Sequence, residues 1–255
     1  MTAADVASST KISTTLSSLG PKTSWTPLQT DKFEAIWYGD SLNDDACDAI
    51  VLYMHGGGFV LGRADSSAEM IVGILSTAKA QHNKTLLGLG LDYKLAPEHK
   101  FPSQLHEALA AYEYLTRSGL VASSRIETTR EQAFTPSYCG RYGLSVNRDT
   151  DTIGADCLSR WAHAYIGTAS AKDPMVSPIL GDFRGCCPML IHYGGKEVFE
   201  DDIDILCERL KEQQVDVTAV KNPLAPHDTL IMPALYGDMA TSGGEIIAAF
   251  LAKFA

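Results

Sequence analysis

A histidine followed by three glycines is the first group in the chain whose types and spacing could support chemistry. His55 and Gly56–Gly58 come directly after a short apolar run and are followed by Phe59. Glycines in such a loop let backbone N–H groups turn toward a developing negative charge without interference from a Cβ atom. A plain strand-to-helix turn that needs positive φ would use the same residues. The triplet therefore predicts either an anion-stabilising loop or a tight turn.

Alternating strands and helices surround this loop and would have to position it. Continuous apolar runs predict buried strands, and apolar residues at helical spacing predict amphipathic helices. We predict strands at 49–54, 85–91, 189–193 and 216–220, and helices at 66–79, 102–115, 201–213 and 243–254. Such alternation is typical of an α/β protein with a mostly parallel sheet covered on both faces.

The bulk composition excludes several classes of function. A net charge of −10 argues against binding a nucleic-acid backbone or an anionic membrane surface. No apolar run approaches the roughly 20 residues that a membrane span needs, and residues 1–15 are too polar for a secretory leader. The six cysteines form no CxxC pair and no metal-ligand pattern. We expect a cytoplasmic protein with free thiols and no metal or cofactor, and its oligomeric state is left open.

A second motif follows the glycine loop, and the two motifs together resemble those of a known family. His55–Phe59, read HGGGF, followed by Asp92–Pro102, read DYKLAPEHKFP, closely resembles the hormone-sensitive-lipase-like branch of the α/β-hydrolases. The resemblance implies the α/β-hydrolase fold and assigns the amides of Gly57 and Gly58 to an oxyanion hole. It gives His55 the role of bracing this loop rather than of carrying a proton.

The second half of the chain is similar to the same family. Asp173–Leu180 matches its DP-x-x-SP segment, and Leu190–Asp202 matches the region of its triad acid. The resemblance places Glu197 at the acid position and His227 at the position of the catalytic histidine, where a carboxylate would orient an imidazole base. Asp201 or Asp202 would be the acid if the register differed by a turn. A solvated loop charge and a surface histidine are the alternatives.

The family's G-x-S-x-G nucleophile elbow is missing from the sequence. The lead-in matches up to Ile126, after which polar residues replace the expected apolar strand and GDSAG-like turn. The nearest substitute is Gly143–Asn147, in which Ser145 is a candidate nucleophile but the second glycine is absent. We therefore expect a deletion near 126–147 that removes the elbow strand and the helix behind it. The domain plan is an N-terminal cap or flexible segment at 1–35 and a hydrolase domain at 36–255.

These observations leave two functions open. The first is a carboxylic ester hydrolase that acts on a small-molecule ester, with a role in secondary metabolism as one option within the family's range. The second is a catalytically inactive relative, or a truncated product, that binds a ligand or a partner without turnover. The missing nucleophile is the feature that separates them, because removing it costs on the order of 10⁶ in kcat.

Overall fold

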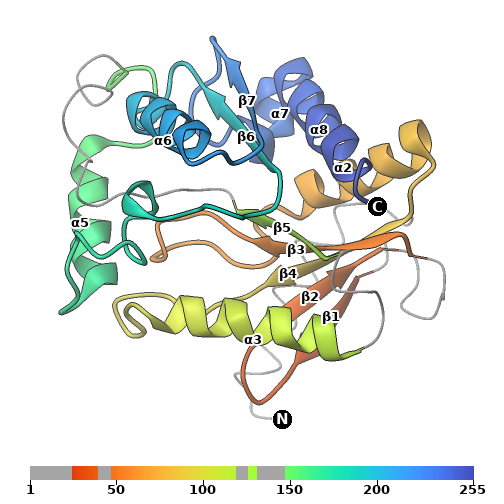
Figure 1. Ribbon diagram of the computed structural model, residues 1–255, viewed down its shortest axis with the longest axis horizontal. Coiled ribbons are helices and arrows are strands. Elements are labelled where there is room, and N and C mark those ends of the chain that lie inside the picture. Colours follow the sequence, from red (N-terminus) through yellow and green to blue (C-terminus); the bar gives the residue numbers. More distant parts are fainter. Residues whose placement is uncertain (1–24, 40–46, 119–125, 131–146) are drawn as a thin grey trace.

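A five-stranded sheet forms the centre of the molecule (Figure 1). The structure is a computed structural model, and it describes residues 25–39, 47–118, 126–130 and 147–255. The strands follow the order β1-β2-β4-β3-β5. Their bounds are β1 Trp25–Gln29, β2 Glu34–Tyr38, β3 Ala49–Met54, β4 Leu86–Leu91 and β5 Ile126–Arg130. The two strands predicted in this part of the chain, β3 and β4, are confirmed.

Strand direction changes across this sheet. β3 is parallel to both β4 and β5, whereas β1 and β2 are antiparallel to each other and β2 is antiparallel to β4. β3 and β4 are buried along almost their whole length, as expected for strands covered on both faces. The β1–β2 pair also places residues 25–29 and 34–35 in the sheet, so the predicted domain boundary at residue 36 falls inside β2.

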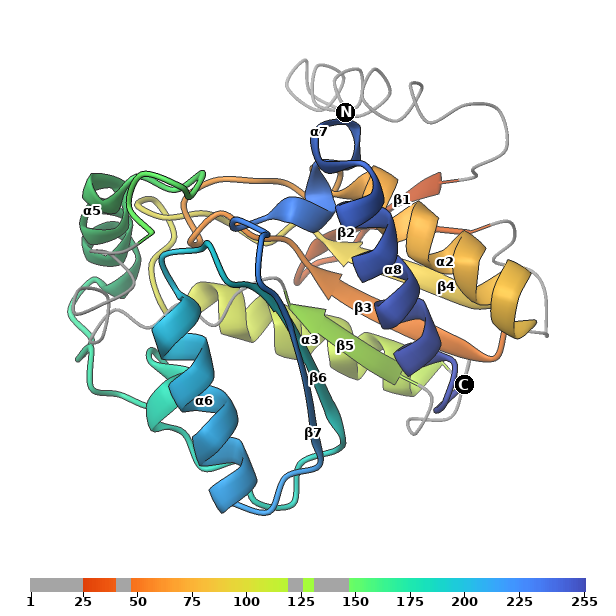
Figure 2. The same cartoon turned by 90° about the horizontal axis from the view of Figure 1, so that it is seen from above.

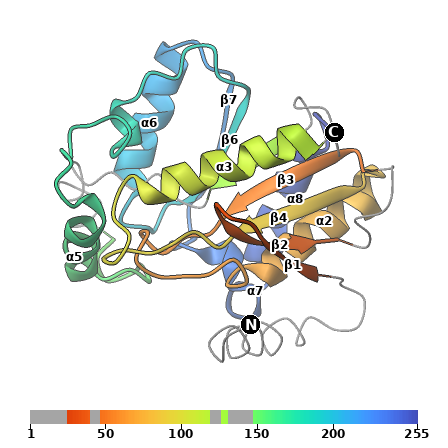
Figure 3. The ribbon, with the colours of Figure 1, turned by 90° about the horizontal axis from the view of Figure 1, so that it is seen from below.

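Helices cover both faces of the sheet. α3, Ser103–Ser118, packs on one face, where Ala111 and Leu115 join a core cluster with Leu52 and Leu89. α2, Ala68–His82, and α8, Asp238–Leu251, lie side by side on the other face, as Figure 2 shows. Seen from below in Figure 3, α3 crosses the strands on the opposite side. Within the described ranges, no helix is both long and apolar enough to cross a membrane.

The strand β5 corrects one sequence-based expectation. We expected the strand before the nucleophile elbow to be lost, which would leave β3 without a neighbour on that side. Ile126–Arg130 instead forms a strand in parallel register with β3, pairing Ile50 with Ile126 and Met54 with Arg130. The loss of this strand is therefore wrong. The expected loss of the elbow and its helix concerns residues 131–146, which lie outside the described part of the chain.

A second, smaller sheet carries the C-terminal half of the fold. β6, Met189–Gly194, pairs in parallel with β7, Val217–Asn222, and α6, Glu200–Glu212, packs beside them. α5, Ala155–Ile166, precedes this unit, and the short α7, Pro233–Tyr236, follows it. Among the described strands, β5 and β6 are not paired, so the two sheets separate at that point. The predicted strands and helices of this half are confirmed.

Candidate active site

The glycine loop begins directly after β3 and has a backbone that only glycine adopts easily. Gly57 has φ 107° and Gly58 has φ 61°, a region that costs residues with a Cβ atom free energy. A Cβ on Gly57 would lie 2.3 Å from the Leu61 carbonyl oxygen, and one on Gly58 would lie 3.0 Å from the Trp161 ring. Both glycines are therefore required by backbone conformation and by close packing.

His55 is fixed by its neighbour Tyr93. The two rings stack with centroids 4.0 Å apart, and the Tyr93 hydroxyl donates to the His55 carbonyl oxygen over 2.6 Å. His55 Nδ1 lies 2.7 Å from the Gly56 carbonyl oxygen. Burial lowers the pKa of the His55 imidazole below its usual value and outweighs the effect of this hydrogen bond. A neutral, immobilised ring suits the bracing role that the sequence predicted.

The amides of Gly57, which is half-buried, and Gly58, which is buried, are backbone donors of the glycine loop. In the part of the chain that the structure describes, neither N–H donates to a protein group. The Gly57 carbonyl oxygen accepts from Val60 and Leu61, which closes the turn and holds the loop in place. Backbone donors that are held in place without an internal acceptor can stabilise an oxyanion.

The structure brings Glu197 and His227 into direct contact. Glu197 Oε2 lies 2.6 Å from His227 Nδ1, and Oε1 accepts the Gly194 N–H over 2.6 Å. Both side chains are buried, with exposed fractions of 3% and 5%. Glu197 follows β6 and His227 follows β7, so two parallel neighbouring strands deliver the pair to the same edge. Asp201 and Asp202 lie in the first turn of α6, so the direct contact comes from Glu197.

A second carboxylate lies on the other side of the imidazole. Asp228 Oδ1 is 3.1 Å from His227 Nε2, so the ring lies between two carboxylates. Burial is the largest single influence and lowers the pKa of His227, but the hydrogen bonds and charges of Asp228 and Glu197 together raise it to about 10. The two carboxylates therefore favour the protonated, imidazolium form of the His227 ring.

Asp151, which no sequence pattern indicated, connects the loop of Glu197 to the loop of His227. One carboxylate oxygen accepts the backbone N–H of His227 over 3.0 Å, and the other accepts that of Val198 over 2.5 Å. Asn147, 2% exposed, donates to the Glu197 carbonyl oxygen over 3.0 Å. Asp151 and Asn147 precede α5 in a polar stretch with no periodic pattern, so no local signal marked them.

α5 connects this pair to the glycine loop. Its residues Leu158 and Ala162 form a core cluster with Val198 and Phe199, which follow Glu197. Trp161 of the same helix lies against Gly58. One helix therefore contacts both the loop of Glu197 and the glycine loop. Ser145, the nucleophile candidate, lies outside the described residues.

Comparisons with known proteins show which family and which folds this chain resembles. A sequence model described as the alpha/beta hydrolase fold matches residues 51–146 and 145–231. An esterase structure from the bacterial hormone-sensitive lipase family is 26% identical, with a TM-score of 0.81, and the match covers 95% of this chain and 89% of that one.

Curated relatives are similar over a shorter part of their length. An acetyl-hydrolase of Streptomyces hygroscopicus is 28% identical over 181 residues, which is 60% of this chain and 58% of that protein. An esterase of Acinetobacter venetianus is 23% identical over 66% of this chain and 63% of its own length. The chain thus matches about three fifths of the length of these two relatives.

Proposed function

The chain belongs to the alpha/beta hydrolase fold family, and from that premise we propose that it is a carboxylic ester hydrolase acting on small-molecule esters. The predicted fold class and the resemblance to the hormone-sensitive-lipase-like branch are confirmed. The observation that carries the proposed activity is the buried contact of 2.6 Å between Glu197 and His227.

Each described part of the site has a distinct role in this proposal. His227 takes a proton from the nucleophile and returns it to the leaving alcohol, while Glu197 holds the ring orientation and stabilises its charged form. The amides of Gly57 and Gly58 stabilise the oxyanion of the tetrahedral intermediate. His55 keeps the glycine loop in place, and Asp151 positions both partners of the acid–histidine pair through their backbone amides.

The contact with Asp228 sets the pH at which this chemistry would operate. A histidine must be neutral to act as a base, and the carboxylates on its two sides raise the pKa of His227 to about 10. Nε2 must also turn from Asp228 to the nucleophile. We therefore expect hydrolysis to rise steeply toward alkaline pH.

The nucleophile is the part of the proposal that needs its own test. Ser145 is our candidate because it precedes by two residues Asn147, whose side chain donates to the Glu197 carbonyl oxygen. The family match also breaks at residues 145–146, which supports our proposal that a segment near 126–147 is deleted. Replacing Ser145 by Ala should abolish turnover if this serine attacks the ester.

The direct experiment measures hydrolysis of p-nitrophenyl acetate and p-nitrophenyl butyrate between pH 7 and pH 10. We expect turnover that is lost in His227→Ala and retained in His163→Ala, a matched control on an exposed face of α5. No hydrolysis by the folded protein at any of these pH values would overturn the proposal and favour the inactive, ligand-binding alternative.

We also propose a cytoplasmic location. Among the described cysteines, Cys157, Cys186, Cys187 and Cys207 form no disulfide, which fits a reducing compartment. Labelling of these thiols in freshly lysed cells without reductant would test the location. Extensive oxidation in vivo would contradict it.

A further inference from the structure

A large cavity lies where the two sheets separate. Its volume is about 410 Å³, within the range of about 300–1,000 Å³ that small-molecule sites occupy. Residues of β3 and β6 face each other across it, α2 and α8 close it on the helix-covered side, and Ile126 of β5 also lines it.

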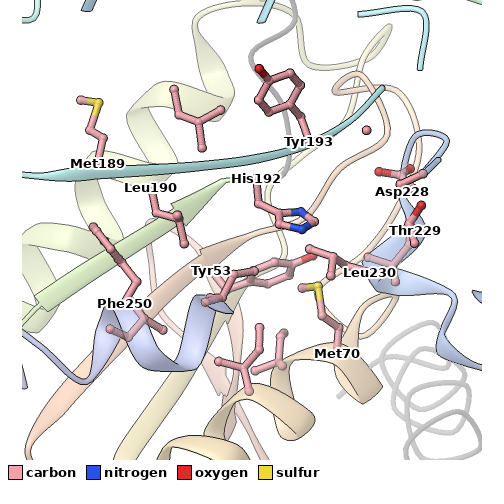
Figure 4. Close-up of a pocket in the computed structure, with 18 of the residues that line it drawn as sticks. Tyr53, Met70, Met189, Leu190, His192, Tyr193, Asp228, Thr229, Leu230 and Phe250 are labelled. Atoms are coloured by element: carbon pink, nitrogen blue, oxygen red, sulfur yellow. The ribbon is translucent and has the colours of Figure 1, made fainter. Parts of the chain in front are cut away.

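The walls of this cavity are mostly hydrocarbon. Leu190 and His192 point into it from β6, whereas Met189 and Tyr193 point away (Figure 4), as alternation along a strand requires. Figure 4 also shows Phe250 and Met70 on the opposite side. The further apolar lining comes from Val51, Ile71, Ile74, Leu75, Leu230 and Ile247.

His192 brings no charge into this space at neutral pH. Burial lowers the pKa of its imidazole, and this effect exceeds the opposing influence of the Glu197 charge. The groups that carry charge lie at one end, where His227 and Asp228 line the cavity. The cavity is therefore polar at one end and apolar along the rest of its length.

The cavity is elongated. Every residue of β6 from Met189 to Gly194 lines it, and a strand of this length spans about 17 Å at about 3.3 Å per residue. Gly194 and Glu197 lie at the end that contains His227, and the exposed Cys187 lies at the other. A largely apolar space of this length fits an extended chain along β6.

We propose that this cavity binds the unbranched acyl chain of the ester, with the carbonyl group at the His227 end and the chain extended along β6. The inference rests on the proposed function, because it names the class of ester that the site would take. An uncharged ester group suits this end better than a free carboxylate, since Asp228 and Glu197 would repel an anion there.

The test uses binding rather than turnover. Methyl ketones from butan-2-one to dodecan-2-one imitate an ester carbonyl and cannot be hydrolysed, and their affinities are measured by calorimetry. Burial of each further methylene should strengthen binding about fourfold until the chain fills the cavity. Leu190→Trp should fill the space and weaken dodecan-2-one binding at least tenfold. Leu109→Trp, at an exposed position on α3, is the matched control and should bind as the unchanged protein does.

The outcomes separate this inference from the proposed function. Affinity that does not increase with chain length, or that is equal in Leu190→Trp and Leu109→Trp, overturns the acyl-chain site even if p-nitrophenyl acetate is hydrolysed. Chain-length-dependent binding without hydrolysis of any ester supports the cavity and refutes the enzyme. Circular dichroism and thermal unfolding establish that Leu190→Trp is folded, and Ile74→Phe gives a second filling variant from the opposite wall.

Discussion

Asp228→Asn is the substitution that most directly tests the state of the histidine. Asp228 has φ 58°, and its carboxylate lies 3.1 Å from His227 Nε2. Asparagine is the other residue that tolerates this left-handed conformation well, so the backbone of the loop should be retained. The substitution removes one negative charge from the imidazole and leaves the contact with Glu197 unchanged.

The expected shift in pKa follows from the distance and the exposure. Two unit charges 3.1 Å apart attract by about 5 kcal/mol at an effective dielectric constant of about 20. The Asp228 side chain is 23% exposed, so solvent screens part of this energy, and an opposite charge at such a distance typically shifts a pKa by about 1–3 units. The pKa of His227, raised to about 10, should therefore fall to between about 7 and about 9.

Activity at neutral pH should rise with this change. The neutral fraction of His227 at pH 7 would increase from about one in a thousand to between about one in a hundred and one in two. Hydrolysis of p-nitrophenyl acetate at pH 7 should therefore increase by at least about tenfold. The pH at half-maximal rate should move down by the same number of units as the pKa.

The imidazole itself can be followed by NMR titration, which does not depend on turnover. The His227 Cε1–H signal, assigned by its absence in His227→Gln, should titrate at lower pH in Asp228→Asn. Asp238→Asn removes an equal charge from an exposed position at the start of α8 and should leave the titration unchanged. An unchanged or raised pKa in Asp228→Asn would refute the reasoning.

Further substitutions test the residues that hold the site and the charge state of His227. Asp151→Asn should lower the hydrolysis rate and broaden the His227 signal, because an amide nitrogen would face a backbone N–H donor; an unchanged signal would contradict its positioning role. Gly57→Ala should destabilise the fold by about 1–3 kcal/mol in urea unfolding, whereas Gly73→Ala, in open space on α2, should stabilise it by up to about 1 kcal/mol. Because the pKa of His227 is raised, the stability that it contributes is present below about pH 6.5 and lost through about pH 10. Thermal unfolding should therefore show a larger fall over this range than in His227→Gln, and equal falls would contradict it.

Local patterns were sufficient to predict the strands and helices that bury apolar residues. β3 and β4 are continuous apolar runs, and α2 has its buried residues at helical spacing. β1 and β2 were not predicted. β1 is largely exposed, the β1–β2 segment contains no long apolar run, and the two strands are defined by their pairing with each other. Strand preference depends strongly on such context.

β5 shows more clearly that a local sequence pattern does not predict every strand. Its sequence, Ile-Glu-Thr-Thr-Arg, has a single aliphatic residue and predicts no buried strand. Its position comes from parallel pairing with β3, which is a tertiary interaction. The sequence therefore suggested a lost strand where the structure has one, and the polar residues that misled the prediction are those at the edge of the larger sheet.

The acid–histidine pair was found through the family resemblance, and its supports were not. Glu197 and His227 follow neighbouring parallel strands, so motif positions were enough to suggest them. Asp151 acts across 76 residues of sequence to reach His227, and no periodicity or spacing reports a contact of that range. Asp228 is adjacent to His227 in the sequence, but its effect on the pKa depends on a left-handed backbone that brings its carboxylate to Nε2.

The break between the sheets connects the unusual features of this chain. β5 keeps its place beside β3 but has no β6 partner among the described strands, and the family match is divided at residues 145–146. The residues just after that division, Asn147 and Asp151, hold the acid and histidine loops by hydrogen bonds. The pair therefore does not depend on a continuous sheet for its geometry. Changes between β5 and β6 would therefore alter the proposed acyl-chain cavity, which β6 lines, while the glycine loop and the contact between Glu197 and His227 remain in place.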